Sequence, residues 1–252
     1  MISDPLFYAV VIPAILLVGI SKGGFGGGVG LIGTPMVALV TTPTRAAAIL
    51  LPILCAMDIV GVVAYRKSWD AVNMRILVPG SVLGILLGTA TFRFLDENLI
   101  RLLIGTLALG FVLRYWLVRE PSAEPAAPSR RAGSLWATLS GFTSFVAHAG
   151  GPPLSVYLLP QHMDKTLFVG TTVIYFAFVN YLKLIPYSFL GQFSGENLLT
   201  SLLLLPLAPA GMWLGIWLHR RIDDQLFYQA VYVMLAVVGL KLLYDGLKPL
   251  TG

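Results

Sequence analysis

Four ionisable residues stand within or beside the long apolar stretches of this sequence: Lys22, Asp58, His148 and Lys183. Such groups are expensive inside a membrane span and usually serve a function there. The lysines can supply positive charge to an anion. Asp58 and His148 are candidates to carry a coupling ion, either a proton or Na+. The structural alternatives are a snorkelling Lys22, a satisfied core His148, and a salt bridge from Asp58 to Lys183 or another buried cation.

Two stretches rich in glycine and proline interrupt the apolar pattern. The first is SKGGFGGGVGLIGTP at residues 21–35, and the second is HAGGPP at residues 148–153. Relative to alanine, a helix interior loses about 1 kcal/mol for each glycine and about 3 kcal/mol for each proline. Unwound backbone at membrane depth is tolerated where it lines a cavity, so paired breaks indicate the binding site of a transporter. Free N–H groups at half-helix ends favour an anion there.

The residues predicted to bind this anion come from both breaks and from the apolar run that follows the second. Thr34, Asn180 and Tyr187 add side chains that can donate hydrogen bonds to an oxyanion. The alternative for the glycines is close helix packing through small residues, which is also our prediction for Gly80-xxx-Gly84-xxx-Gly88 and Gly211-xxx-Gly215. The full predicted set is Lys22, Gly23, Gly24, Gly26, Gly27, Gly28, Thr34, Pro35, His148, Gly150, Gly151, Pro152, Asn180, Lys183 and Tyr187.

Composition identifies the class of protein that must position these residues. The 252 residues are 57% hydrophobic and only 12% charged, whereas a soluble domain carries about 25% charged residues. Bilayer-spanning helices need roughly 17–25 mainly apolar residues. Charge-free runs of about this length or longer occur at 5–21, 23–44, 76–92, 132–163, 166–182 and 197–219. The sequence therefore predicts an all-α, polytopic helical membrane protein, whose net charge of +5 orients it in the bilayer and does not indicate a nucleic-acid partner.

The chain divides into two related halves, 1–118 and 134–252, joined by a polar linker at 119–133. A shift of 122 residues pairs Asp58 with Asn180 and Tyr65 with Tyr187. Ten basic residues fall in the loops of one face and five on the other, so the positive-inside rule favours two inverted repeats. Each repeat opens with a broken or re-entrant glycine-rich segment. The three helices that then follow are predicted at 44–66, 73–94 and 98–118, and at 166–190, 197–218 and 225–247.

Enzymatic chemistry finds no support in the sequence. No H-E-x-x-H motif or comparable pair of ionisable residues is present, so we predict no catalytic residue, no metal ligand and no cofactor. The GxGxxG pattern from Gly28 to Gly33 lies between apolar segments without a βαβ context, and it does not predict a dinucleotide site. The single cysteine, Cys55, excludes an intramolecular disulfide.

The sequence resembles the TauE/SafE family of sulfite exporters, which are also grouped as sulfonate permeases. The matching motifs are GISKGGFGGGVGLIGTPMV at 19–37 and GFTSFVAHAGGPPLSVYLL at 141–159. The resemblance covers nearly the whole chain, including the short polar linker between the halves. It implies a multi-pass transporter of the cell inner membrane whose substrate is a sulfur-containing oxyanion, an organosulfonate or another small organic anion.

These observations together predict a secondary transporter that moves sulfite, thiosulfate or an organosulfonate by alternating access. Its partners would be the small anion, a coupling proton or Na+ and the lipid bilayer, and the sequence leaves a homodimer open. Two other functions stay open as well. One is a transporter or channel for a different small inorganic or organic anion, since paired broken helices also build pores. The other is a subunit of a membrane complex with no transport function.

Overall fold

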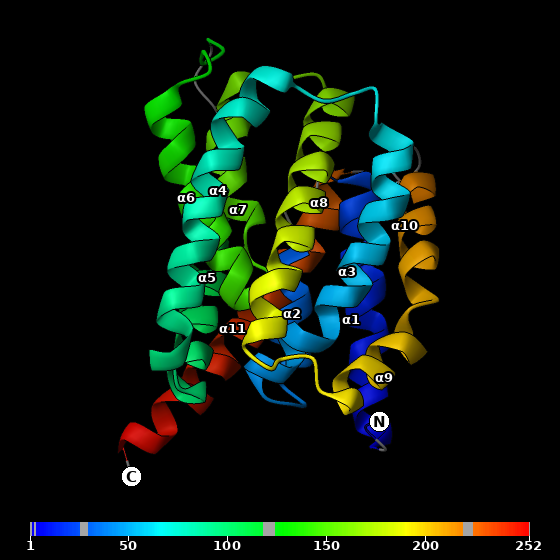
Figure 1. The fold of residues 1–252 in the computed structure, drawn as a ribbon, viewed down its shortest axis with the longest axis vertical. Helices are drawn as coiled ribbons and strands as arrows, with labels where there is room; N and C mark the ends of the chain where they lie inside the picture. The colour runs from blue at the N-terminus through cyan, green and yellow to red at the C-terminus, as the bar shows by residue number, and fades with distance from the viewer. Residues whose placement is uncertain (1, 3, 26–29, 118–123, 219–223, 252) are drawn as a thin grey trace.

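The computed structural model describes residues 2, 4–25, 30–117, 124–218 and 224–251, and every regular element in this part of the chain is helical (Figure 1). Three short 3-10 turns accompany the α-helices: η1 (Gly30–Ile32), η2 (Phe92–Phe94) and η3 (Leu159–Gln161). The α-helices are α1 (Pro5–Gly24), α2 (Gly33–Val37), α3 (Pro43–Tyr65), α4 (Ala71–Thr91), α5 (Glu97–Leu117), α6 (Arg130–Ala147), α7 (Gly151–Leu158), α8 (Lys165–Phe189), α9 (Gly195–Leu204), α10 (Leu207–Leu218) and α11 (Asp224–Thr251).

Several of these helices have the length and apolarity that a membrane span requires. Within the described residues, α1, α3, α4 and α8 meet both conditions singly, and α9 and α10 meet them as a bent pair. The predicted polytopic helical membrane protein is thereby confirmed. α5 and α11 form close to the places where the sequence also predicts spans, but they do not meet this measure over their described residues.

Short polar residues set where most of these helices begin. Thr42 accepts a hydrogen bond from the backbone N–H of Arg45 at the start of α3, and Asp70 accepts one from Asn73 at the start of α4. Such caps satisfy backbone donors that have no partner within the helix. Ser129 caps α6 in the same way, so the helix begins at Arg130. The predicted linker at 119–133 is therefore too long, because its last four residues are helical.

The helix predicted as continuous over 197–218 is wrong. The structure has two helices there, α9 and α10, which meet at a bend of 41°. Pro206 lies in the two-residue gap between them. Proline lacks the backbone N–H that would bond to the carbonyl four residues earlier, and its ring clashes with that carbonyl. Hydropathy alone did not register this local break.

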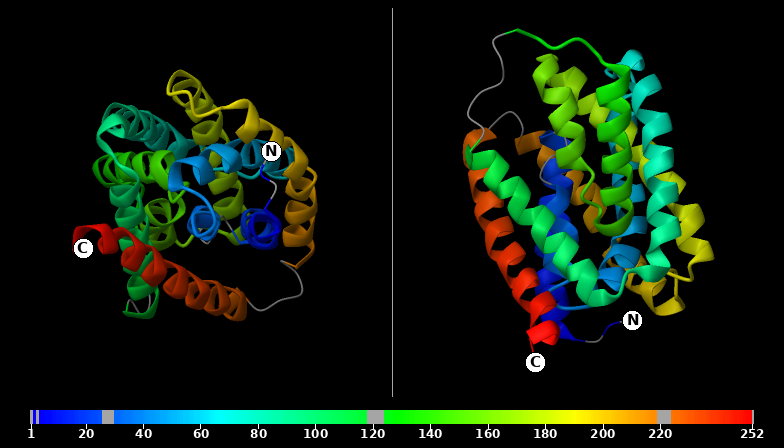
Figure 2. Two further views of the ribbon diagram at one scale, coloured as in Figure 1. Left: turned by 90° about the horizontal axis from the view of Figure 1, so that it is seen from below. Right: turned by 90° about the vertical axis from the view of Figure 1, so that its left-hand side faces the viewer.

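The two halves of the chain are interlocked through their opening helices. α1 packs against α10 of the second half, and α6 packs against α4 of the first half. The remaining large contacts join α3 to α8 and α5 to α11. Figures 1 and 2 show that corresponding helices run in opposite directions: α1 and α3 rise from the end where the N-terminus lies, whereas α6 and α8 descend from the other end.

Glycines allow these interlocking helices to approach closely. A Cβ atom added to Gly84 of α4 would lie 2.1 Å from the carbonyl oxygen of Thr138 in α6. One added to Gly215 of α10 would lie 2.5 Å from the carbonyl oxygen of Ile20 in α1. The predicted packing role of the glycines in these two helices is confirmed.

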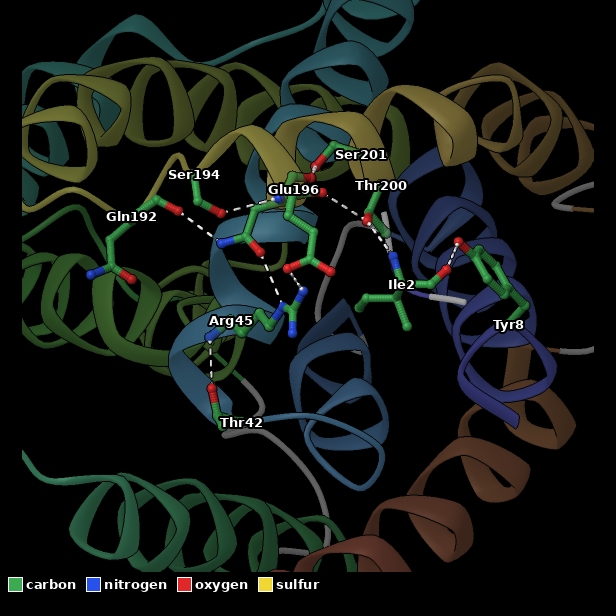
Figure 3. A network of polar contacts seen from close by, with 10 residues as sticks. Ile2, Tyr8, Thr42, Arg45, Gln192, Ser194, Glu196, Thr200 and Ser201 are labelled. Atoms are coloured by element: carbon green, nitrogen blue, oxygen red, sulfur yellow. Dashed lines mark hydrogen bonds and ion pairs between the residues drawn. The ribbon is translucent and has the colours of Figure 1, made fainter. Parts of the chain in front are cut away.

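A polar cluster ties the start of α3 to α9 near the N-terminal end of the molecule (Figure 3). Arg45 forms an ion pair with Glu196 at 2.7 Å and donates to the Asn197 side chain at 3.1 Å. Ser201 donates to the backbone carbonyl of Ile49 at 2.8 Å. The bent α9 is thus held against α3, and the two halves are joined at this end as well.

Candidate anion site

A small cavity lies between the two halves at the glycine-rich breaks. Its volume is about 40 Å³, and a single water needs about 10–15 Å³ on the same measure. The lining combines α1, α2 and α3 of the first half with α6, α7 and α8 of the second. The residues that line it are Val18, Lys22, Gly33, Thr34, Leu50, Leu54, Ser144, His148, Gly151, Phe176 and Asn180. Lys22, Thr34, His148, Gly151 and Asn180 of the predicted set are therefore brought together.

Lys22 forms a buried ion pair beside this cavity. Its ammonium nitrogen Nζ donates to Oδ1 of Asp58 at 2.5 Å, and the Asn180 amide donates to Oδ2 of the same carboxylate at 2.7 Å. All three residues are buried. Asp58 thus pairs with Lys22, and its expected alternative partner Lys183 lies elsewhere. The contact also joins Asp58 directly to Asn180, its counterpart under the shift of 122 residues.

Lys183 occupies the other end of the polar cluster, against the break in α6. Its Nζ donates to the carbonyl oxygen of Ser144 at 2.9 Å and to the Ser144 hydroxyl at 3.0 Å. It also lies 2.7 Å from Nδ1 of His148, whose Nε2 lies 2.9 Å from the carbonyl oxygen of Ala47. A carbonyl only accepts, so Nε2 carries a proton. Nδ1 therefore accepts a hydrogen bond from Lys183, and the pair carries one positive charge when the lysine is protonated.

The charges around the cavity do not cancel. Within the part of the chain that the structure describes, Lys183 has no carboxylate in ion-pair contact, whereas the charge of Lys22 is balanced by Asp58. Lys22, Asp58 and the Lys183–His148 pair sum to one positive charge when Lys183 is protonated. A buried charge without a counter-ion is costly. A bound anion would supply the missing negative charge and remove that cost. The charge of the groups around the cavity therefore favours an anion over a cation.

The backbone at His148 turns the chain into the second break. His148 ends α6 in the left-handed region, with φ of 52°, and its N–H bonds to the carbonyl of Ser144 at 3.0 Å. Histidine is among the residues enriched at positive φ when glycine is absent. This cap leads the chain directly into α7 and places the imidazole at the cavity wall.

Tyr65 and Tyr187 perform equivalent structural roles in the two halves. The Tyr65 hydroxyl donates to the carbonyl of Gly23 at 3.0 Å, and the Tyr187 hydroxyl donates to the carbonyl of Phe145 at 2.6 Å. The two acceptors are themselves 122 residues apart, so the same bond is made twice. Tyr187 is consequently engaged with the end of α6 and does not line the cavity.

Several predicted site residues lie near the cavity without lining it. A Cβ added to Gly23 would lie 2.4 Å from the carbonyl oxygen of Met212, and one added to Gly150 would lie 2.8 Å from that of Ser140. Close packing, the alternative given for these glycines, describes both positions. Gly24, Pro35 and Pro152 are buried but also do not line the cavity, and Gly26, Gly27 and Gly28 fall outside the described residues. Lys183 and Asp58 do not line it either, and each lies behind residues that do, Lys183 behind Ser144 and His148 and Asp58 behind Lys22 and Asn180.

Ser144 lines the cavity but is not in the set of residues predicted from the sequence. It contacts Lys183 through both its carbonyl and its hydroxyl. A signal was present, because the shift of 122 residues pairs Ser144 with Lys22, which lies beside the first break. Thr34, which was predicted, has a buried hydroxyl without a hydrogen-bond partner among the described residues. That hydroxyl is free to donate to a ligand in the cavity.

Comparison with known proteins identifies the family of the chain. No curated protein matches the chain, and no solved structure matches it. A family model described as sulfite exporter TauE/SafE matches residues 11–242, which include both glycine-rich breaks and all the cavity residues. The chain is therefore a multi-pass membrane protein that belongs to the sulfite exporter TauE/SafE family.

Proposed function

We propose that this protein is a secondary transporter that moves a small sulfur-containing anion across the cell inner membrane by alternating access. Sulfite, thiosulfate or an organosulfonate is the substrate class. The observation that carries the proposal is the buried contact of Lys183 with His148, which has no carboxylate partner among the described residues and lies beside a cavity at both chain breaks. No covalent chemistry of the protein is required for this function.

The polar groups around the cavity suit an oxyanion. The hydroxyl of Thr34 has no partner among the described residues, and the Ser144 hydroxyl contacts Lys183. Each can donate to an anion oxygen, and Lys183 supplies charge. The volume of about 40 Å³ corresponds to a few water-sized groups. This size favours sulfite or thiosulfate over an extended organosulfonate.

Alternating access is supported by the way the halves meet. The cavity lies between elements of both halves, so a movement of one half against the other would open it to either side. Corresponding helices run in opposite directions in Figure 1, as an inverted repeat requires. We therefore propose that the halves are inverted repeats. Their movement against each other exposes the site to one face of the membrane and then to the other.

Flux measurements test the proposal directly. The purified protein in proteoliposomes should take up sulfite or thiosulfate at a saturable rate, and empty liposomes should not. Absence of flux for every small anion tried would remove the transport function. Discrete single-channel currents in a planar bilayer would instead identify a channel.

Lys183→Gln provides the matching test of the site. We expect anions to stabilise the wild-type protein against heat, by about 2.7 kcal/mol when their concentration is a hundred times Kd. The variant should lose this stabilisation because its cavity no longer carries the extra charge. Lys241→Gln is the control, since Lys241 pairs with Asp245 on α11, away from the cavity. An unchanged shift in the Lys183 variant would remove this lysine from the site.

A further inference from the structure

The Lys22–Asp58 pair places a second positive charge beside the cavity but keeps it occupied. Asp58 contacts the ammonium of Lys22 at 2.5 Å, and the carboxylate is fully buried. Any anion that uses another N–H group of Lys22 must share the ammonium with Asp58 and is repelled by this carboxylate. Protonation of Asp58 removes the repulsion, because a neutral carboxylic acid carries no charge.

We infer that Asp58 adapts the cavity to the charge of its substrate: a divalent anion is carried together with one proton on Asp58, and a monovalent anion is carried without one. This inference rests on the transport function proposed above. The same cavity then accepts both monovalent and divalent anions. Asp58 is the residue that decides whether a proton accompanies them.

The charges of the site depend on the protonation of its groups. With Lys183 protonated, the empty site carries one net positive charge, since Asp58 cancels Lys22 and the Lys183–His148 pair holds the remaining charge. A monovalent anion brings the site to zero with Asp58 ionised. A divalent anion would leave the site at minus one, and a proton on Asp58 restores zero. Net charge at membrane depth is costly, so the neutral loaded state is favoured in each case.

Asp58 is the only described carboxylate in contact with Lys22. α2 and α10, which also pack on α3, carry no ionisable side chain in their described residues. Near the start of α3, Arg45 pairs with Glu196 of α9, and Arg101 of α5 donates to the carbonyl of Ala38. The other ionisable groups of α3, α8 and the cavity wall in this region are Cys55, Tyr65, His148, Tyr181, Lys183 and Tyr187. Among them, Lys183 and His148 contact each other through nitrogen atoms that can share a proton, so this pair is the alternative carrier.

Two anions of similar size and shape but different charge test this inference. Thiosulfate and methanesulfonate are tetrahedral anions with five non-hydrogen atoms, and over the neutral range they carry two and one negative charges. Proteoliposomes holding a pH-sensitive dye should acidify when thiosulfate enters and stay unchanged when methanesulfonate enters. Thiosulfate affinity should fall about tenfold for each pH unit above neutrality, because one proton binds with it. Methanesulfonate affinity should stay flat. This part of the test needs no variant.

The variant Asp58→Asn mimics the protonated carboxyl permanently. It should bind thiosulfate without pH dependence and transport it without protons. Asp245→Asn is the matched control, because it removes a carboxylate that also pairs with a lysine but lies on α11. The exchange variant Asp58→Asn/Asn180→Asp returns a carboxylate to the same contact, where the two side chains now meet at 2.7 Å. It should restore the proton requirement.

Three results would overturn the inference while leaving transport intact. They are proton entry with both probes, proton entry with neither, and an unchanged pH slope in Asp58→Asn. A slope that disappears in His148→Gln while persisting in Asp58→Asn would assign the proton to the Lys183–His148 pair instead. If neither probe binds or crosses the membrane in the wild-type protein, the proposed transport function fails, and this inference fails with it.

Discussion

Single side chains around the cavity divide into those already satisfied and those left open for a ligand. Asp58, Asn180 and Tyr187 use their polar atoms on protein partners. Thr34 does not, and its buried hydroxyl has no partner among the described residues. A buried unpartnered group costs stability in the empty protein. Because Thr34 also lines the cavity, its hydroxyl is placed to donate to a ligand there.

The variant Thr34→Val tests whether the Thr34 hydroxyl donates a hydrogen bond to the bound anion. We expect thermal stability without anion to be unchanged or slightly higher, because the variant removes a buried hydroxyl that has no partner. Anion affinity should fall roughly tenfold or more, since a hydrogen bond to a charged group contributes about 1.5–3 kcal/mol. Thermal unfolding with and without sulfite measures both effects.

Thr143→Val is the control for the same chemical change. The Thr143 hydroxyl makes three hydrogen-bond contacts to backbone carbonyls, including that of Ala149 at 3.0 Å. Its loss should lower stability and leave the relative anion effect unchanged. Equal anion shifts in the Thr34 variant and the wild type would show that the Thr34 hydroxyl does not face the ligand.

The residue types that matter were readable from the sequence, but their pairings were not. Isolated charges in apolar runs identified Lys22, Asp58, His148 and Lys183. Which carboxylate faces which lysine depends on helix rotation, and hydropathy carries no information on that. Ser144 escaped because serine is common in membrane helices, and only the repeat comparison with Lys22 would have singled it out.

The helices α4 and α6 approach each other closely through small residues. Gly84→Ala should destabilise the protein by about 1–3 kcal/mol or more, because the new Cβ would lie 2.1 Å from the backbone carbonyl of Thr138. Backbone atoms cannot yield as a flexible side chain would. Gly110→Ala on α5 is the control, since an added Cβ there meets nothing within 4 Å.

The control variant should be neutral or more stable by up to about 1 kcal/mol, because alanine favours the helix over glycine. Thermal unfolding in one detergent compares the two variants. Equal stability of both would mean that α4 and α6 do not meet through Gly84.

Helix positions were predictable from apolar run length, whereas the bend at Pro206 was not, since an averaged hydropathy ignores a single missing N–H.

The whole molecule depends on contacts between its halves. Each opening helix packs on the other half, α1 on α10 and α6 on α4. If the chain is divided within the linker at 119–129, we expect neither half alone to accumulate as a folded protein. Co-expression of both halves should restore a complex that survives size-exclusion chromatography in detergent. A stable, monodisperse first half on its own would contradict the interlocked arrangement.

Matching residues at a shift of 122 predicted two related halves, but they did not predict which helices of one half contact which helices of the other. The structure brings Asp58 against its own counterpart Asn180 and pairs α3 with α8. Contacts of this kind are set by how two similar surfaces complement each other, and no local sequence pattern encodes that.

The packing of α1 on α10 also determines the order of events while the chain is being synthesised. α1 is synthesised before α3, whereas α10, the helix that covers its glycine face, follows much later in the chain. Asp58 arrives early with α3 and can neutralise Lys22 soon after both have entered the bilayer. The charged side of α1 is thus covered during translation, and the glycine side stays open to lipid or to the insertion machinery until α10 arrives.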